Sequence, residues 1–137
     1  MPESLTVSAI FPVKREKLYK AWLSSKEHTS FTGSKALINP KKGGKFTAWD
    51  DYIRGKNLEL EPYSKIVQAW RTTEFSEKDP DSVLQLTFED LKGKTRLTLK
   101  HTQIPDGQAK RSKQGWKDFY FKSMKEYFKK SGQAKKK

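Results

Sequence analysis

The sequence predicts an α+β fold: a curled antiparallel sheet of about seven strands, two short helices, and a long C-terminal helix packed across the sheet. Residues 4–11 alternate like a strand, two short helical segments follow, and six further strand segments lie between residues 35 and 102. The segment from Ala109 to Lys130 then has apolar side chains at helical spacing. A sheet with one apolar face needs a cover, and only this last helix is long enough to supply it.

The first part of the chain is predicted to form a strand, two helices and a second, short strand. Apolar and other residues alternate over residues 4–11, and Pro12 ends this strand. The next segment is a helix because apolar residues at i, i+3 and i+4 share one face, namely Leu18, Ala21 and Trp22. The following short helix ends near Gly33, and residues 35–39 form the short strand.

Residues 43–71 are predicted to form a meander of three antiparallel strands. Aromatic and β-branched residues favour strands at 45–49, 52–60 and 65–71. The acidic pair Asp50-Asp51 marks the first turn, and Pro62, which fixes its own φ, marks the second. Gly55, inside the middle strand, indicates either a bulge or a close approach of two backbones.

Two longer strands and the C-terminal helix complete the predicted fold. Lys92-Gly93 turns between strands at 82–89 and 95–102. The side chains expected on the inner face of these strands are Leu84, Leu86, Phe88, Leu97, Leu99 and His101. The apolar face expected on the helix consists of Trp116, Phe119, Tyr120, Met124, Tyr127 and Phe128, with lysines largely filling the other side.

Length and composition indicate one domain at residues 1–131, followed by a basic disordered tail at 132–137. The 137 residues are 34% hydrophobic and 12% aromatic, so the core depends on Phe, Tyr and Trp. The absence of cysteine excludes disulfides, thiol nucleophiles and cysteine-based metal sites. No signal-peptide pattern and no apolar run of ~20 residues is present, so we expect a soluble, cytoplasmic monomer without a membrane span.

The net charge of +13 is concentrated at the C-terminal end. Residues 110–137 contain 11 Lys and Arg against 2 acidic residues, a balance of +9, which leaves +4 for residues 1–109. Such a segment could contact phosphates or an acidic partner. Lysines that coat the solvent face of an amphipathic helix and its tail explain the same pattern, and we favour this interpretation over nucleic-acid binding.

The sequence offers little support for catalysis. His28 lies in a polar segment and is expected to be solvent-exposed, whereas His101 is expected to point inward as a hydrogen-bonded structural residue. Proton transfer by His101 is the alternative, but it requires a partner and a cleft. Acid pairs such as Asp50-Asp51 are common in turns. No nucleophile motif, phosphate loop or metal-ligand spacing is found, so we predict no enzymatic activity, no cofactor and no metal site.

One set of residues, taken in order and spacing, resembles a known family. The set is Gly43-Gly44, Phe46, Trp49-Asp50, Gly55, Glu59–Pro62, Ile66-Val67, Trp70-Arg71, residues 97–102, Ile104-Pro105, Gly115-Trp116, Tyr120 and Tyr127-Phe128. It resembles the domain of activators of the heat-shock protein 90 ATPase, within the START and birch-pollen-allergen (SRPBCC) superfamily, over nearly the whole chain. The resemblance implies a helix-grip fold, in which the sheet curls round the helix and can leave an apolar cavity between them.

Two functions are compatible with this resemblance. In the first, a small hydrophobic molecule lies between sheet and helix, and the candidate lining is Phe46, Ala48, Ile53, Leu58, Ile66, Gln68, Trp70, Leu84, Leu86, Phe88, Leu97, Leu99, His101, Trp116, Tyr120 and Tyr127, with Trp49 near one end. Any one of these apolar residues is more often packed core than pocket wall. In the second, the resemblance implies a co-chaperone-like module that binds a heat-shock protein 90-type chaperone through its surface. We expect the binding protein to be linked to the stress response. Only the C-terminal half of the full activators is matched, so we expect binding rather than ATPase stimulation.

Overall fold

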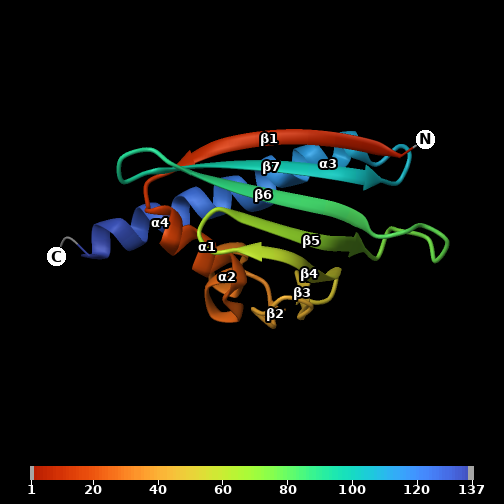
Figure 1. The fold of residues 1–137 in the computed structure, drawn as a ribbon, viewed down its shortest axis with the longest axis horizontal. Coiled ribbons are helices and arrows are strands. Elements are labelled where there is room, and N and C mark those ends of the chain that lie inside the picture. The colour runs from red at the N-terminus through yellow and green to blue at the C-terminus, as the bar shows by residue number, and fades with distance from the viewer. Residues whose placement is uncertain (1, 136–137) are drawn as a thin grey trace.

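The structure is a computed structural model that describes the backbone of residues 2–135 and the side chains of residues 2–129. It confirms the α+β architecture, with one antiparallel sheet in the strand order β1-β7-β6-β5-β4-β3-β2. The strands are β1 (Glu3–Phe11), β2 (Leu37–Ile38), β3 (Lys45–Ala48), β4 (Ile53–Glu61), β5 (Lys65–Thr72), β6 (Ser82–Asp90) and β7 (Thr95–Ile104). The helices are α1 (Arg15–Leu23), α2 (Ser25–Thr32), and a C-terminal run of α3 (Ala109–Gly115), η1 (Trp116–Phe121) and α4 (Lys122–Lys135). In Figure 1 the C-terminal run lies behind the sheet and crosses it.

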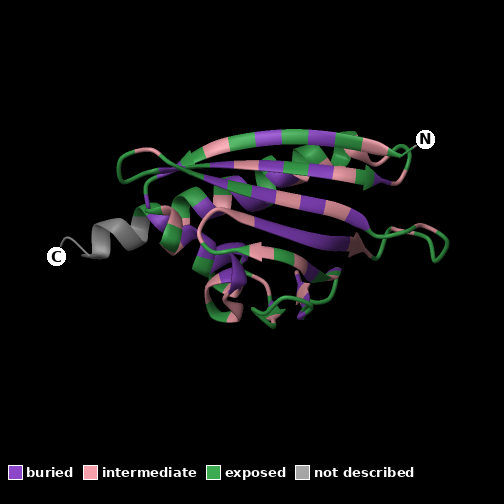
Figure 2. Ribbon diagram, viewed as in Figure 1, coloured by how far each residue is buried: buried purple, intermediate pink, exposed green. Residues whose placement is uncertain are grey.

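Inward-pointing side chains form rows that run across the strands. One row consists of Val7, Leu99, Leu86 and Ile66. The next row consists of Leu5, His101, Leu84, Gln68 and Asn57. Burial therefore alternates along β6 and β7, as Figure 2 shows, and the predicted inner face of these two strands is confirmed. The second row brings His101, Gln68 and Asn57 into the core, and it lies toward the end of the sheet where a pocket opens.

Strand β4 contains both a close backbone approach and a bulge, at different residues. A Cβ atom on Gly55 would lie 1.8 Å from the carbonyl oxygen of Ala69, so only glycine fits there. The bulge lies between Asn57 and Glu59. A bulge adds one residue and changes which side chains face the core. Asn57, before the bulge, is buried and Leu60, after it, packs against the core, whereas Leu58 is half-buried and lies outside the hydrophobic core cluster.

The two short helices end where the sequence predicts. The Ser24 hydroxyl accepts a hydrogen bond from the backbone N–H of Glu27 and so caps α2. Gly33 ends α2 in the left-handed conformation, with φ of 81°, which glycine adopts without steric cost. Trp22, near the end of α1, lies in the core, where its indole N–H donates to Gln68 Oε1 at 3.2 Å.

The C-terminal run contains an irregularity that the sequence analysis did not predict. A π-helical turn, η1, separates α3 from α4. Because a π turn holds more residues than an α turn, it changes which side chains face the sheet. Phe121 is therefore buried, and the prediction that Phe119 belongs to the buried face is wrong, since Phe119 is 61% exposed. Phe121 and Phe128 contact Phe11 edge-to-face, with ring centroids 5.7 and 6.2 Å apart.

The described part of α4 ends at Lys135. Residues 136 and 137 of the predicted basic tail lie outside the described residues, so the tail at 132–137 stays a prediction. Within the described chain, no helix has both the length and the apolar character needed to cross a bilayer.

Candidate functional site

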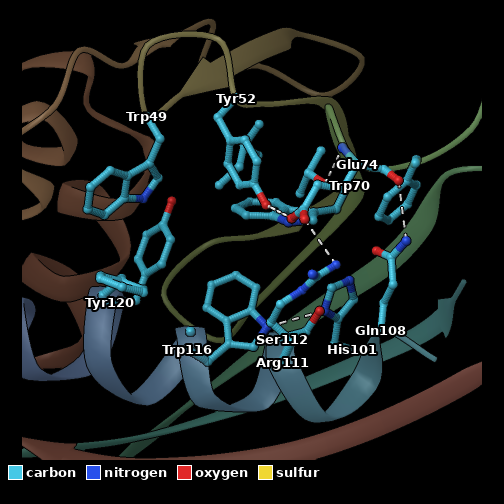
Figure 3. Close-up of a pocket in the computed structure, with 15 residues that line it drawn as sticks. Trp49, Tyr52, Trp70, Glu74, His101, Gln108, Arg111, Ser112, Trp116 and Tyr120 are labelled. Atoms are coloured by element: carbon cyan, nitrogen blue, oxygen red, sulfur yellow. Dashed lines mark hydrogen bonds and ion pairs between the residues drawn. The ribbon is translucent and has the colours of Figure 1, made fainter.

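A pocket of about 440 Å³ opens between the C-terminal run and one end of the sheet. Its lining is Trp49, Tyr52, Ile53, Trp70, Thr72, Glu74, Phe75, His101, Gln108, Arg111, Ser112, Gly115, Trp116, Phe119 and Tyr120. Figure 3 shows Trp49 and Tyr120 on one side of the pocket and Glu74, Arg111 and Gln108 on the other. Nearly half of these residues are aromatic, and the polar groups gather at one edge. The pocket is therefore an aromatic chamber with a polar rim.

The π-helical turn η1 forms the helical wall of this chamber. It contributes Trp116, Phe119 and Tyr120. The Trp116 ring packs against Trp70 of β5 and against Tyr120, with centroid distances of 5.1 and 4.9 Å. Gly115, just before the turn, has open space beside it, because a Cβ there would meet only Phe119, at 3.9 Å. A π turn often marks a functional site, and here the residues of the turn line the pocket.

The loop between β3 and β4 forms the opposite wall and has an unusual backbone. Trp49, Asp50 and Asp51 all adopt left-handed conformations, with φ of 53°, 53° and 74°. Each such non-glycine residue costs roughly 1–2 kcal/mol. The Tyr52 amide N–H donates to the Trp49 carbonyl at 3.1 Å and closes the turn. This geometry holds the Trp49 ring against Phe119 and Tyr120, at centroid distances of 6.1 and 6.2 Å.

His101 is held in one neutral tautomer at the base of the pocket. Its Nδ1 accepts from the Trp116 indole N–H at 3.2 Å, so the proton is on Nε2 and is donated to Ser82 Oγ at 2.7 Å. The Ser82 hydroxyl in turn donates to the Trp70 carbonyl at 2.5 Å. Burial lowers the pKa of His101 to about 4. A protonated Nε2 cannot act as a base toward Ser82, so this pair is a structural link and not a nucleophile with its base.

The prediction that His28 is exposed is wrong. Its side chain is 2% exposed, and Nδ1 donates to the Trp22 carbonyl at 2.9 Å. Nε2 must then accept from the Tyr120 hydroxyl, 3.1 Å away. Burial lowers the pKa of His28 to about 4 and raises the pKa of Tyr120 far above its usual range, although hydrogen bonding with the Trp49 indole opposes the second shift. Helix α2 folds back onto η1 to bury His28, a tertiary contact that a local polar sequence does not reveal.

The polar rim is centred on Glu74. Its carboxylate accepts a hydrogen bond from the Tyr52 hydroxyl and pairs with Arg111 Nη2 at 3.0 Å. Its backbone carbonyl accepts from Gln108 Nε2 at 3.3 Å. These contacts connect the segment after β5 to α3 across the pocket mouth. Arg71 pairs with Asp81 at 2.6 Å and lies over the Phe75 ring, at 5.5 Å from its centroid.

The structure places some of the predicted lining residues at the pocket and the others elsewhere in the fold. Ile53, Trp70, His101, Trp116 and Tyr120 line the pocket, together with Trp49. The buried residues elsewhere in the core are Phe46, Ala48, Ile66, Gln68, Leu84, Leu86, Phe88, Leu97 and Leu99. Tyr127 is half-buried and donates to Glu27 Oε1 at 3.0 Å. Sequence reasoning did not identify the rim, namely Tyr52, Thr72, Glu74, Phe75, Gln108, Arg111 and Ser112, although residues 108, 111, 112, 115 and 119 have the spacing of one helix face.

The buried polar groups at this site are engaged in hydrogen bonds within the protein. Both buried histidines are committed to hydrogen bonds as neutral rings. Among the described residues, no group of three or more His, Cys, Asp or Glu is arranged to hold a metal ion. Every fully buried side-chain nitrogen and oxygen in the described part of the chain has a hydrogen-bond partner. The site also has an open volume with aromatic walls, and such a volume suits noncovalent binding.

Known proteins similar in sequence come from one family. Residues 12–129 match the family described as activator of Hsp90 ATPase homolog 1-like protein. The human Activator of 90 kDa heat shock protein ATPase homolog 1 is 31% identical over 124 residues, which are 90% of this chain and 36% of the relative. A Dictyostelium discoideum Activator of 90 kDa heat shock protein ATPase homolog is 34% identical over 100 residues, 72% of this chain and 26% of the relative. The chain thus spans about a third of the length of the human relative and about a quarter of the length of the Dictyostelium one.

Solved structures show the same fold. An HSP90 activator from Plasmodium falciparum has a TM-score of 0.83 and 28% identity, and the match covers 88% of this chain and 92% of that chain. Ara h 8.0201 has a TM-score of 0.72 at 15% identity, covering 93% of this chain and 98% of that chain, which shows the shared fold alone. The helix-grip fold implied by the resemblance is confirmed. With a family match from residue 12 to residue 129, this chain belongs to the activator of Hsp90 ATPase homolog 1-like family.

Proposed function

We propose that this family member is a non-catalytic binding protein that holds a small apolar molecule in the aromatic pocket. The observation that carries the proposal is the open volume of about 440 Å³ between η1 and the sheet. Ligand pockets typically measure roughly 300–1,000 Å³ and have mostly apolar walls with a few polar groups. The pocket has both properties, with Trp49, Trp70 and Trp116 as walls and Glu74 at the rim.

Native mass spectrometry of the protein purified from its own source tests this proposal. We expect a co-purifying small molecule, and we expect Gly115→Leu to abolish its retention. Gly115 is helical and its Cβ direction is open, so leucine fits the backbone and fills the pocket. Lys113→Leu, at an exposed position of the same helix that does not line the pocket, is the matched control. Absence of any bound molecule, together with no binding of an apolar fluorescent dye to the wild type, would contradict the proposal.

The relatives favour a second candidate, binding to a heat-shock protein 90-type chaperone in the cytoplasm. The Plasmodium falciparum structure is named as an HSP90 activator. The match covers 92% of that chain, so a chain of similar length is described as an HSP90 activator. A pull-down with the purified chaperone at low salt, followed by an ATPase assay, tests this role. Electrostatic contacts of a chain with a net charge of +13 are least screened at low salt, so failure to bind there would exclude it.

A further inference from the structure

We infer that one face of the C-terminal run is a docking surface for an acidic helical segment of a partner protein. The face carries a row of exposed lysines, called here the lysine stripe: Lys110, Lys113, Lys117, Lys122, Lys125 and Lys129. None of the six lines the pocket, so the inference is independent of any pocket ligand.

The π-helical turn η1 aligns the six lysines. The first three are spaced by three and four residues, and so are the last three, which places each group on one face of a helix. Lys117 and Lys122 are five residues apart, a spacing that in an uninterrupted α-helix separates them by about 140° round the axis. In η1 the Lys122 amide N–H donates to the Lys117 carbonyl, which is the hydrogen bond of a π turn and keeps both on one side. The two groups therefore form one row, about 28 Å long at ~1.5 Å per residue.

The charge of the lysine stripe is not neutralised within the described part of the chain. None of its lysines forms an ion pair with a described carboxylate. The acids within the run, Asp118 and Glu126, each follow a lysine of the stripe by one residue and so lie about 100° round the axis from it. Glu3, Glu27 and Glu74 reach the run from other elements, and their carboxylates bond to groups outside the stripe. A partner can therefore reach all six ammonium groups.

The lysine stripe is unfavourable for the isolated protein. Lys113 and Lys117 are an i,i+4 pair, as are Lys125 and Lys129, and like charges at this spacing destabilise a helix. Lys110 and Lys113 also lie in the first turns of the run, where the helix dipole disfavours cations. A solvated surface of ordinary composition mixes both signs of charge. A partner that brings negative charge relieves this repulsion.

An acidic helix is the partner that matches the lysine stripe. Glutamates three and four residues apart recur along a helix with the same rise as these lysines, so carboxylates can face ammonium groups along the whole row. Readers of nucleic-acid sequence use arginine pairs to base edges or aromatic stacking, and the stripe contains neither residue type. A membrane-surface helix inserts apolar side chains. On this run Met124 and Phe128 are fully buried, and the exposed Phe119 lies at the pocket.

The test uses a stapled helical peptide of three heptads with glutamate at the first and fourth positions of each heptad. Its binding to the wild type is measured by fluorescence anisotropy at low salt, where exposed charges are least screened. The control is a stapled peptide of the same composition whose glutamates are spread round the helix. We expect the aligned peptide to bind about tenfold more tightly, because several weak surface pairs then form together.

A triple variant of the protein locates the binding face. Lys113→Gln, Lys117→Gln and Lys122→Gln together should weaken binding of the aligned peptide about tenfold. The matched control removes the same charge from exposed lysines outside the run, by Lys42→Gln, Lys56→Gln and Lys100→Gln, and should weaken binding far less. Because repulsion is relieved, the stripe variant should be at least as stable to heat as the wild type. A clear loss of stability would show that these lysines support the fold itself and would contradict the inference.

The remaining outcomes also decide. Equal binding of the two peptides, or equal loss of affinity in the two triple variants, would reduce the effect to net charge and overturn the inference, as would failure of the aligned peptide to bind. Tighter binding of duplex DNA, or of vesicles that contain phosphatidylserine, would replace the protein partner by a nucleic acid or a membrane. Retention of a small molecule in the pocket is measured separately, so each of these results leaves the proposed ligand-binding function intact.

Discussion

The two ends of the sheet–helix interface use aromatic residues to opposite effect. At the packed end, Phe11, Phe121 and Phe128 are at most 5% exposed and interlock edge-to-face. At the open end, Trp70 and Trp116 border a pocket of about 440 Å³. The phenylalanine side chain has no polar atom, so it can be buried without a hydrogen-bond partner. A buried tryptophan needs an acceptor for its N–H, and Trp116 finds it in His101. The open end is therefore held by specific hydrogen bonds as well as by contact area.

The largest expected effect is at the packed end. Phe128 is fully buried, and Phe128→Ala should lower the free energy of unfolding by about 3–5 kcal/mol because it leaves a cavity. Chemical denaturation measures this loss. The affinity of the remaining folded protein for a pocket ligand should be unchanged. A loss below about 1 kcal/mol would mean that the two ends do not differ in packing.

Acidification should destabilise the open end, where His101 accepts from Trp116, and the contact between α2 and η1, where His28 accepts from Tyr120. The pKa values of His28 and His101 are lowered to about 4, so both rings are neutral in the folded protein, while the unfolded chain takes up these protons near 6.5. Between these values the unfolded state binds more protons, so stability is full above pH 6.5 and falls as the pH drops toward 4, by up to about 3 kcal/mol for each histidine.

Carboxylates also titrate in this range, so the measurement is the difference between the wild type and His101→Gln. The variant should lose less stability between pH 6.5 and pH 4.5 than the wild type. Parallel stability curves would show that His101 is not held neutral.

A smaller effect is expected from Trp116→Phe. The substitution keeps an aromatic ring but removes the donor to the buried Nδ1 of His101, which should cost about 1–3 kcal/mol of unfolding free energy. The pKa of His101 should rise toward its usual value, because Nδ1 is then free to accept a proton. Histidine signals in an NMR pH titration report this shift. A pKa that stays at its wild-type value would show that burial alone controls the ring.

The smallest effect on stability is expected from Phe119→Ala. Phe119 is 61% exposed, so thermal unfolding should change by no more than about 0.5 kcal/mol. Ligand affinity should nevertheless fall, since the ring is part of the pocket wall. Together with Phe128→Ala, this substitution separates stability from binding. A large loss of stability here would place Phe119 in the core, as the sequence predicted.

Most of the fold could be predicted because its signals are local. Alternation identified the inner faces of β6 and β7, and Gly33 marked the end of α2. The errors lie where one residue changes the register. The bulge between Asn57 and Glu59 places Leu60 rather than Leu58 against the core, and the π turn η1 exchanged Phe119 for Phe121 on the buried face. Neither irregularity has a strong local signature, because each is stabilised by contacts with distant strands and helices.

The sequence by itself determined the order of strands and helices, the apolar rows of the sheet and the family. Those properties depend on periodicity and on residue order, which are present in one dimension. Only the tertiary structure decided that His28 is buried, that Glu74 and Arg111 meet across a pocket mouth, and that the aromatic residues divide into a packed end and an open end. Each of these depends on residues far apart in the chain, and their distances are set by how the helix crosses the curled sheet.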